Sequence, residues 1–419
     1  MSAFISKCPF VPMNTPHTCS YEASSGKSRP IAHAFNVAER RFGENFDGST
    51  HAAVIKMMMH ALGPSPSDMF RHVVPSGRGC DVTMKDEFKV HVTQEELRRV
   101  AQVSRFSGDD PVVVMNANFA LAVFVKRKQV AGDYPRFEAA LEKTLQGETT
   151  LRVLKGMGVS GLSQHVPPSE MKRKGVVAVM ETHSLGSALV VDGVGHHYAG
   201  QRAVGDRYGY VLFPDKPQVV SLGKLTASER PKDIWGGFYQ GVQGNCVTVS
   251  AIKAAMMRFG QSPQAIYRQV TATSTGYEVV MRDSFTLRLT HEELNKARAA
   301  SWLAGADQQL LEDANFLYAV SAKRAQLENN DFRASQGYDV ALATLSDGEF
   351  PGQALRRLGL FGYLRESDVN ELAKGAIGTL AGNGHSVVVI NGAFDLYGQK
   401  HDLASSRWMN TGFRALKLV

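Results

Sequence analysis

The chain has 419 residues, of which 43% are hydrophobic and 21% are charged, and its formal net charge is +7. This composition is typical of a globular protein of two or three domains, and no apolar run approaches the roughly 20 residues of a membrane helix. The basic residues are dispersed, with short runs at 126–128 and 172–174, so we do not expect a nucleic-acid-binding protein.

Residues 1–35 are rich in Ser, Pro and Thr, and their first acidic residue is Glu22. Such a composition buries little apolar surface, so we expect a disordered tail. The segment also lacks the pattern of a cleaved secretory signal. It resembles the Ser-rich, acid-poor openings of bacterial effectors that type III secretion exports without cleavage. That resemblance implies secretion into a host cell, with the bacterial cytoplasm as the alternative location.

The rest of the sequence contains a tandem duplication. MNANFALAVFVKRKQ at 115–129 matches EDANFLYAVSAKRAQ at 312–326 with eight identities, and GSTHAAVIK at 48–56 matches NCVTVSAIK at 245–253 at the same offset of 197 residues. Repetition at a fixed offset indicates two copies of one structural unit. We therefore predict a first copy at 36–213, a proline-containing linker at 214–233 and a second copy at 234–419.

Each copy has the same predicted order of elements. In the second copy, apolar residues at helical spacing predict a helix that begins at 246, and alternation predicts a hairpin within 277–289. Thr290 and Glu293 match a capping box that begins another helix. The apolar run at 384–392 predicts a late strand that enters an Asn-Gly turn. Helices first and antiparallel sheet last make each copy an α+β unit.

Only the second copy has a cysteine at the start of its first helix. Cys246 follows Gly244 and Asn245, whereas the first copy has Ser49 at the matching position. A cysteine attacks as a thiolate, and the unpaired N–H groups of a helix start lower a thiol pKa. The amide of Gln240, six residues upstream, can help the Cys246 N–H stabilise an oxyanion. The sequence thus predicts an active second copy and an inactivated first copy.

His385, at the beginning of the late strand, is a suitable base for this thiol. A histidine there can face the helix start and form a thiolate–imidazolium pair. A gapless match of 384–399 with 186–201 puts Ser187 opposite His385, although His183 is the sister residue if a short insertion separates it from the strand. Nucleophile and base therefore occur together in the second copy, and the first lacks at least the nucleophile.

The phrase QGVQGNC at 240–246 resembles the Q-G-x-x-G-[D/N]-C motif of calpain-type members of the papain-like cysteine protease superfamily. The order of Gln, Cys, helix and late-strand His is also that of the superfamily. The resemblance implies Cys246 as nucleophile, His385 as general base and Gln240 as oxyanion donor, in two tandem papain-like units of which the first is degenerate. The aromatic residue that follows the cysteine in the superfamily is replaced by Val247.

A third residue should orient the imidazole from the strand that pairs with the one His385 begins. A tight turn at 391–392 places a residue near 398 opposite His385, and a longer turn places Asp402 there. The spacing in the superfamily favours Asp402, with Trp408 as a shielding aromatic, and Asp395 is the alternative.

The resemblance implies a cysteine-dependent hydrolase that cleaves a protein substrate, such as a protein of a host cell. The same triad also serves deamidation, transglutamination and acyl transfer, because water or an amine can resolve an acyl-enzyme. A non-catalytic binding scaffold is the third interpretation. We expect no cofactor and no metal, because the cysteines lack metal-type spacing and His196-His197 has no second ligand cluster. The first copy is expected to dock on the second, where it recruits substrate or shields the cleft.

Overall fold

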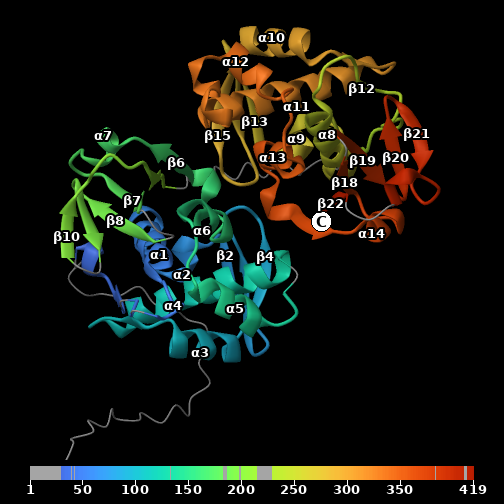
Figure 1. Ribbon diagram of the computed structural model, residues 1–419. Coiled ribbons are helices and arrows are strands. Elements are labelled where there is room, and N and C mark those ends of the chain that lie inside the picture. The colour runs from blue at the N-terminus through green and yellow to red at the C-terminus, as the bar shows by residue number, and fades with distance from the viewer. Residues whose placement is uncertain are drawn as a thin grey trace, which may run out of the picture.

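The structure is a computed structural model that describes residues 30–38, 40–41, 43–132, 134–182, 186–197, 200–214, 229–382, 384–409 and 413–419. Most of the predicted tail and linker, and the alternative sister residue His183, lie outside these residues. The described chain forms two lobes, which run from blue to green and from yellow to red in Figure 1.

The first lobe contains short and long helices and eleven strands within the described residues. Its helices are η1 Ile31–His33, α1 Ser49–Leu62, α2 Pro66–Met69, α3 Gln94–Val103, α4 Pro111–Ala131, α5 Phe137–Leu145, α6 Thr150–Gly156, η2 Ser160–Leu162 and α7 Pro168–Met171. Its strands are β1 Asn36–Val37, β2 His72–Ser76, β3 Gly79–Thr83, β4 Lys89–Thr93, β5 Phe106–Ser107, β6 Ser163–Val166, β7 Val177–Glu181, β8 Ser187–Val191, β9 Val194–His197, β10 Gly200–Ala203 and β11 Gly209–Leu212.

The second lobe repeats this series. Its helices are α8 Cys246–Phe259, α9 Pro263–Ile266, α10 His291–Ser301, α11 Gln308–Leu327, η3 Asn330–Phe332, η4 Ala334–Gln336, α12 Tyr338–Ala343, α13 Pro351–Arg357, η5 Phe361–Tyr363, α14 Val369–Ala373 and η6 Arg407–Met409. Its strands are β12 Tyr239–Gln240, β13 Gln269–Thr273, β14 Gly276–Val280, β15 Thr286–Thr290, β16 Leu303–Ala304, β17 Leu364–Ser367, β18 Gly378–Gly382, β19 His385–Ile390, β20 Ala393–Leu396, β21 Gln399–Asp402 and β22 Arg414–Leu418.

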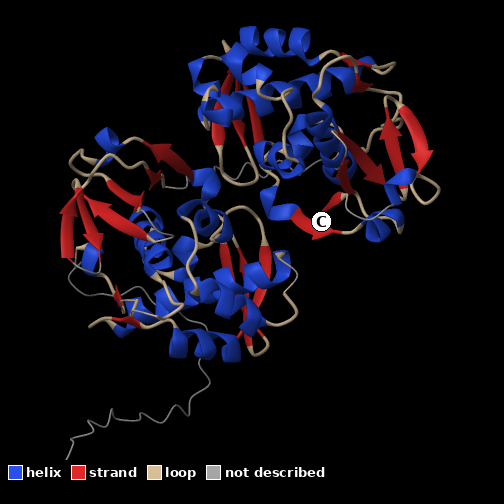
Figure 2. Ribbon diagram, viewed as in Figure 1, coloured by secondary structure: helices blue, strands red, loops and turns tan. Residues whose placement is uncertain are grey.

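The sheets of the two lobes have the same topology. The six-stranded sheet has the order β6-β11-β7-β8-β9-β10 in the first lobe and β17-β22-β18-β19-β20-β21 in the second. A three-stranded sheet and a two-stranded ribbon also recur, and every strand pair is antiparallel. Figure 2 shows the central helices of each lobe, α1 and α4 in the first and α8 and α11 in the second, between its two larger sheets. The predicted α+β class is therefore confirmed, and the two lobes repeat one strand order; each hairpin has an additional strand, β2 or β13, that the sequence pattern did not predict.

The boundaries of the units differ slightly from the predicted ones. Ala32 and Phe35 are buried in the core of the first lobe, so this unit begins at about Ile31 rather than at 36. The N–H of Gln261 donates to the carbonyl of Glu229, so the second unit includes residues that precede 234. None of the helices in the described part of the chain is long and apolar enough to cross a membrane.

Residues that are identical in the two copies form equivalent buried contacts in the two lobes. Arg127 forms an ion pair of 2.7 Å with Asp86, and Arg324 forms one of 2.7 Å with Asp283. Both arginines lie on the long apolar helix of their lobe, and both aspartates lie in the hairpin turn against which that helix packs. A buried guanidinium needs a charged partner. The match at 115–129 thus reflects packing, as the buried-helix interpretation predicted.

The two lobes contact each other through equivalent segments. A Cβ on Gly362 of the second lobe would lie 1.9 Å from the carbonyl oxygen of Asp86, and a Cβ on Gly161 of the first lobe would lie 2.1 Å from that of Asp283. Only glycine allows such close backbone approach. The contact surfaces are therefore the same on both copies, as in a two-fold symmetric dimer.

Candidate active site

The cysteine lies where the sequence predicted it, at the first position of a helix. α8 begins at Cys246, and Asn245 occupies the N-cap position with φ −96° and ψ 23°. The Asn245 side chain does not cap the helix, because its amide donates to the carbonyl oxygen of Ser301 at 2.8 Å. This bond fixes the loop in front of the cysteine. The Cys246 side chain is largely buried, with 8% of its surface exposed.

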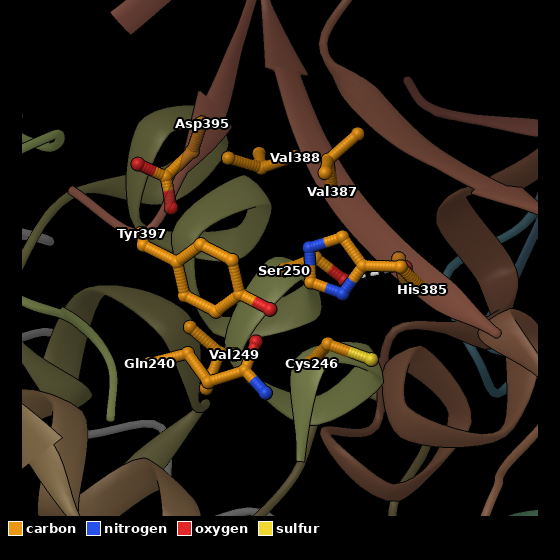
Figure 3. A pocket seen from close by; sticks show the side chains of 10 residues that line it. Gln240, Cys246, Val249, Ser250, His385, Val387, Val388, Asp395 and Tyr397 are labelled. Carbon is orange, nitrogen blue, oxygen red and sulfur yellow. Dashed lines mark hydrogen bonds between the residues drawn. The ribbon is translucent and has the colours of Figure 1, made fainter. Parts of the chain in front are cut away.

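β19 brings His385 to the same place. The backbone N–H of Ser386 donates a hydrogen bond to the Cys246 thiol, so the strand begins directly beside the nucleophile. The hydroxyls of Ser386 and Ser250 are 2.9 Å apart, which fastens β19 to α8 one turn further along the helix. The imidazole of His385 and the thiol of Cys246 line one small cavity, as Figure 3 shows. The predicted nucleophile and base are therefore brought together.

Gln240, the predicted oxyanion donor, lines the same cavity from β12. Its Nε2 atom donates to the carbonyl oxygen of Gln243 at 2.5 Å, inside the loop that leads to Cys246. A primary amide carries two N–H bonds, so the group has a second donor beyond this contact. In Figure 3 the amide lies below the Tyr397 hydroxyl, on the side of the cavity opposite His385.

The prediction that favoured Asp402 as the third residue is wrong, because Asp402 does not line the cavity that contains Cys246 and His385. Ile390 pairs with Ala393, so Asn391 and Gly392 form a two-residue turn, with φ 50° and 77°. That tight turn leads into β20, and a second turn at Tyr397 and Gly398 leads into β21, whose residues do not line the cavity. The Asp402 carboxylate is exposed and accepts the N–H of Ser405 at 2.9 Å. The sequence could not determine the length of this turn.

The alternative, Asp395, lines the cavity together with His385. Burial lowers the pKa of the His385 imidazole, and the Asp395 carboxylate opposes this effect without cancelling it. Among the described residues no hydrogen bond joins the two side chains. One carboxylate oxygen accepts the N–H of Gly398 at 3.1 Å, and the other lies 3.0 Å from the Nζ of Lys253. Asp395 thus acts on His385 through space rather than through a shared proton.

Lys253 is a residue of the site that the sequence interpretation missed. It is 0% exposed, and its ammonium also donates to the Trp235 carbonyl at 3.1 Å and lies 5.1 Å from the Phe238 ring centroid. A signal was available, because a lysine follows an apolar run at this point of both copies, at Lys56 and Lys253. A cation inside the apolar part of a helix requires a buried partner.

The shielding aromatic is Tyr397 rather than Trp408. The Tyr397 ring stacks on the His385 ring, with centroids 5.4 Å apart and an interplanar angle of 21°. Trp408 instead packs on Phe394 and Phe413 in a separate apolar cluster. Tyr397 has φ 51° in the tight turn between β20 and β21. With its hydroxyl pointing into the space between His385 and Gln240, the cavity is only about 10 Å³, enough for one water molecule.

Burial dominates the electrostatics of the cysteine and the histidine. It raises the pKa of the Cys246 thiol, an effect that the N–H groups of Ser386, Val247 and Cys246 itself oppose. It lowers the pKa of His385. Both directions favour the uncharged thiol and imidazole. Burial therefore favours a neutral pair at rest rather than the expected thiolate–imidazolium pair.

The first lobe has neither the cysteine nor the histidine at the equivalent positions. Counting back from the matching turns at 192–193 and 391–392, Gly186 rather than Ser187 is the counterpart of His385. The N–H of Ser187 donates to the Ser49 hydroxyl at 3.4 Å, as that of Ser386 does to Cys246. The gapless match was one residue out of register. A shift of one residue exchanges the two faces of a strand, so the correction matters.

The same counting assigns the other counterparts. His196 stands in the place of Asp395. Val37 stands in the place of Gln240, because Val37 pairs with Phe106 of β5 as Gln240 pairs with Leu303 of β16. Lys56 keeps the place of Lys253, because it also binds a backbone carbonyl and lies 5.1 Å from a Phe ring centroid. Among the described residues, the first lobe thus retains the lysine, here partly buried, without a carboxylate partner.

Within the described residues, no group of three or more His, Cys, Asp and Glu side chains could hold a metal ion. Comparisons with family models, with curated proteins and with solved structures found no match for this chain.

Proposed function

We propose that the second lobe is a cysteine-dependent hydrolase of papain-like type that cleaves a protein substrate. One observation carries the proposal: the predicted nucleophile, base and oxyanion donor line a single cavity, and the first lobe lacks all three. Cys246 and Gln240 come from a helix and a ribbon that adjoin in the sequence, and His385 comes from a strand that begins 139 residues after the cysteine. Loss confined to these positions, in a copy that keeps its core, supports a chemical role for them.

In the proposed reaction, the Cys246 sulfur attacks the scissile carbonyl carbon while its proton passes to the neutral imidazole of His385. The oxyanion receives the Cys246 N–H and the Gln240 amide. His385 then returns the proton to the leaving nitrogen as the C–N bond breaks, which leaves a thioester. Water attacks the thioester, gives a proton to His385, and releases the acid and the thiol. Asp395 stabilises the transient imidazolium.

Two experiments test this function in the full chain. A small electrophile should form an adduct at Cys246 that intact-mass analysis detects, and Cys246→Ala should prevent it. Proteome-wide mapping of new N-termini after addition of the protein should reveal cleavage that Cys246→Ala abolishes. Adduct formation without new N-termini would indicate that Cys246 is reactive but that the reaction is deamidation or acyl transfer rather than peptide hydrolysis. Absence of both results would leave the binding scaffold.

A further inference from the structure

Trp302 lies beside the loop that connects Gln240 to Cys246. It follows Ser301, whose carbonyl accepts the Asn245 amide at 2.8 Å, and it precedes Leu303, which pairs with Gln240. A Cβ on Gly241 would lie 2.1 Å from the Trp302 carbonyl oxygen and 3.5 Å from its Cβ. Residue 302 is therefore clamped on both sides against the backbone that forms one wall of the candidate site.

The indole is exposed although the backbone beneath it is fixed. Trp302 has φ 50°, a left-handed conformation that disfavours large side chains, and 56% of its surface is accessible. Val242, in the adjacent loop between Gln240 and Cys246, is 82% exposed. Exposed apolar side chains on a strained, fixed backbone gain nothing from the fold, so a bound molecule is the expected source of their stabilisation.

The first lobe shows what this position looks like without a substrate to bind. Arg105 is the counterpart of Trp302, with φ 57° and with the same hydrogen bond between the preceding serine and a helix asparagine. Arg105 pairs with Glu44 at 2.8 Å and stacks on Phe46 at 4.2 Å, both in a loop that is longer in the first lobe. There the position holds an exposed arginine that is paired with a glutamate; in the second lobe it holds an exposed apolar side chain.

We infer that Trp302, with Val242, is a specificity-determining residue that binds an apolar side chain of an extended protein segment close to the scissile bond. This inference rests on the proposed function. The loop from Gln240 to Cys246 contains Gly241, which packs against the Trp302 backbone, and Gly244, which is exposed, so an extended segment can approach the loop backbone at Gly244. Aromatic and branched aliphatic side chains bury the most surface on an indole, so they are the class that this residue selects.

The test uses full-length Cys246→Ala protein and a library of randomised peptides, so that binding is measured without turnover. Selected peptides should be enriched in aromatic or aliphatic residues at one position. Trp302→Arg, which installs the residue of the first lobe in a backbone conformation that accepts it, should weaken binding of these peptides about tenfold. Leu327→Arg is the matched control, because Leu327 is exposed at the opposite end of α11 in the same lobe. It should change binding less than about twofold.

Enrichment that is absent, or that persists unchanged in Trp302→Arg, overturns the inference. Incubation of the selected peptides with the wild-type protein tests the hydrolase separately. If the wild-type protein cleaves peptides whose binding does not depend on Trp302, the inference about Trp302 is wrong but the proposed hydrolase function stands. Trp302-dependent binding without any cleavage would remove the function and keep the binding role.

Discussion

The Nζ of Lys253 and a carboxylate oxygen of Asp395 form a buried ion pair of 3.0 Å that links α8, the helix that begins at Cys246, to β20, the strand next to that of His385. Burial lowers the pKa of Lys253, and Asp395 opposes that effect. Burial raises the pKa of Asp395, and Lys253 opposes that in turn. Each charge thus keeps the other ionised in an environment that favours neutrality.

Lys253→Met should therefore destabilise the chain and shift its activity. Removal of one partner from a buried pair costs about 3 kcal/mol, measurable as the free energy of unfolding of the second lobe in urea. Without the ammonium, the pKa of Asp395 rises further, so the acid limb of the pH–rate profile should move to higher pH. An unchanged acid limb would show that the ion pair is structural only.

Lys56→Met in the first lobe should have the opposite effect on stability. Burial lowers the pKa of Lys56 from 10.5 to about 8. The unfolded chain therefore binds more protons between pH 8 and 10.5, and the free energy of unfolding of the wild-type protein should rise with pH across that window. The free energy of unfolding of the variant should not show this rise. At pH 7 it should exceed that of the wild-type protein by about 2 kcal/mol, because removal of the buried charge outweighs loss of the hydrogen bond to Ala32. Destabilisation at pH 7 would contradict the assignment of Lys56 as a cation that has no carboxylate partner among the described residues.

Asp395→Asn and Asp402→Asn separate the two candidates for the third residue. Asp395→Asn should lower kcat/KM about 100-fold, because no carboxylate then stabilises the imidazolium. Asp402→Asn alters an exposed carboxylate outside the cavity and should stay within about twofold. Circular dichroism of both variants controls for unfolding, since the first also leaves Lys253 without its partner. The reverse ranking would restore Asp402.

The sequence predicted what local pattern determines and missed what depends on turn length. Helix starts, capping boxes and the late strand follow from periodicity, so Cys246 and His385 were found at the ends of predicted elements. Asp402 and Trp408 were misplaced because the lengths of the turns around β20 and β21 were unknown, and Ser187 was misplaced because β8 was matched to β19 one residue out of register. A strand alternates faces at every residue, so one residue of uncertainty in a turn removes all knowledge of which side chains face the site. Lys253 was missed because periodicity assigns a lysine to the surface.

The pH dependence of Cys246 alkylation tests whether the resting pair is neutral. With the thiol pKa raised and the imidazole pKa lowered by burial, the alkylation rate should increase steadily towards alkaline pH. A plateau between pH 5 and 8 would instead indicate a stable thiolate–imidazolium pair. The activity should be lost as the pH falls through the lowered pKa of His385, because a protonated imidazole cannot accept the thiol proton.

Tyr397→Ala should open the cavity. The ring stacks on His385 and reduces the enclosed space to about 10 Å³, so its removal should increase the alkylation rate of Cys246 several-fold at constant pH. Turnover should fall at the same time, because the imidazole loses the surface that orients it. Tyr397→Phe keeps the ring and serves as the control for the hydroxyl. If alanine leaves the alkylation rate unchanged, Tyr397 does not cover the nucleophile.

Glu87 of the first lobe is the main charged contact between the lobes. It pairs with Arg268 at 2.8 Å and Arg282 at 3.1 Å, and it accepts the Tyr363 hydroxyl. Burial raises the pKa of Glu87, but these second-lobe partners lower it more. The contribution of Glu87 to docking is therefore complete above pH 4.5 and lost as the pH falls through its lowered pKa.

Glu87→Ala should consequently weaken docking by about 3 kcal/mol, since it leaves two half-buried guanidinium groups unpaired. Calorimetry should show the unfolding of the two lobes as separate transitions where the wild-type protein shows one. Ser284→Ala, at the sister position, removes only a hydroxyl that accepts from Arg268 at 2.8 Å and is the mild control. Among the described residues, those that line the cavity all belong to the second lobe, so the alkylation rate of Cys246 should not change in Glu87→Ala. A faster rate in that variant would show that the first lobe shields the cleft after all.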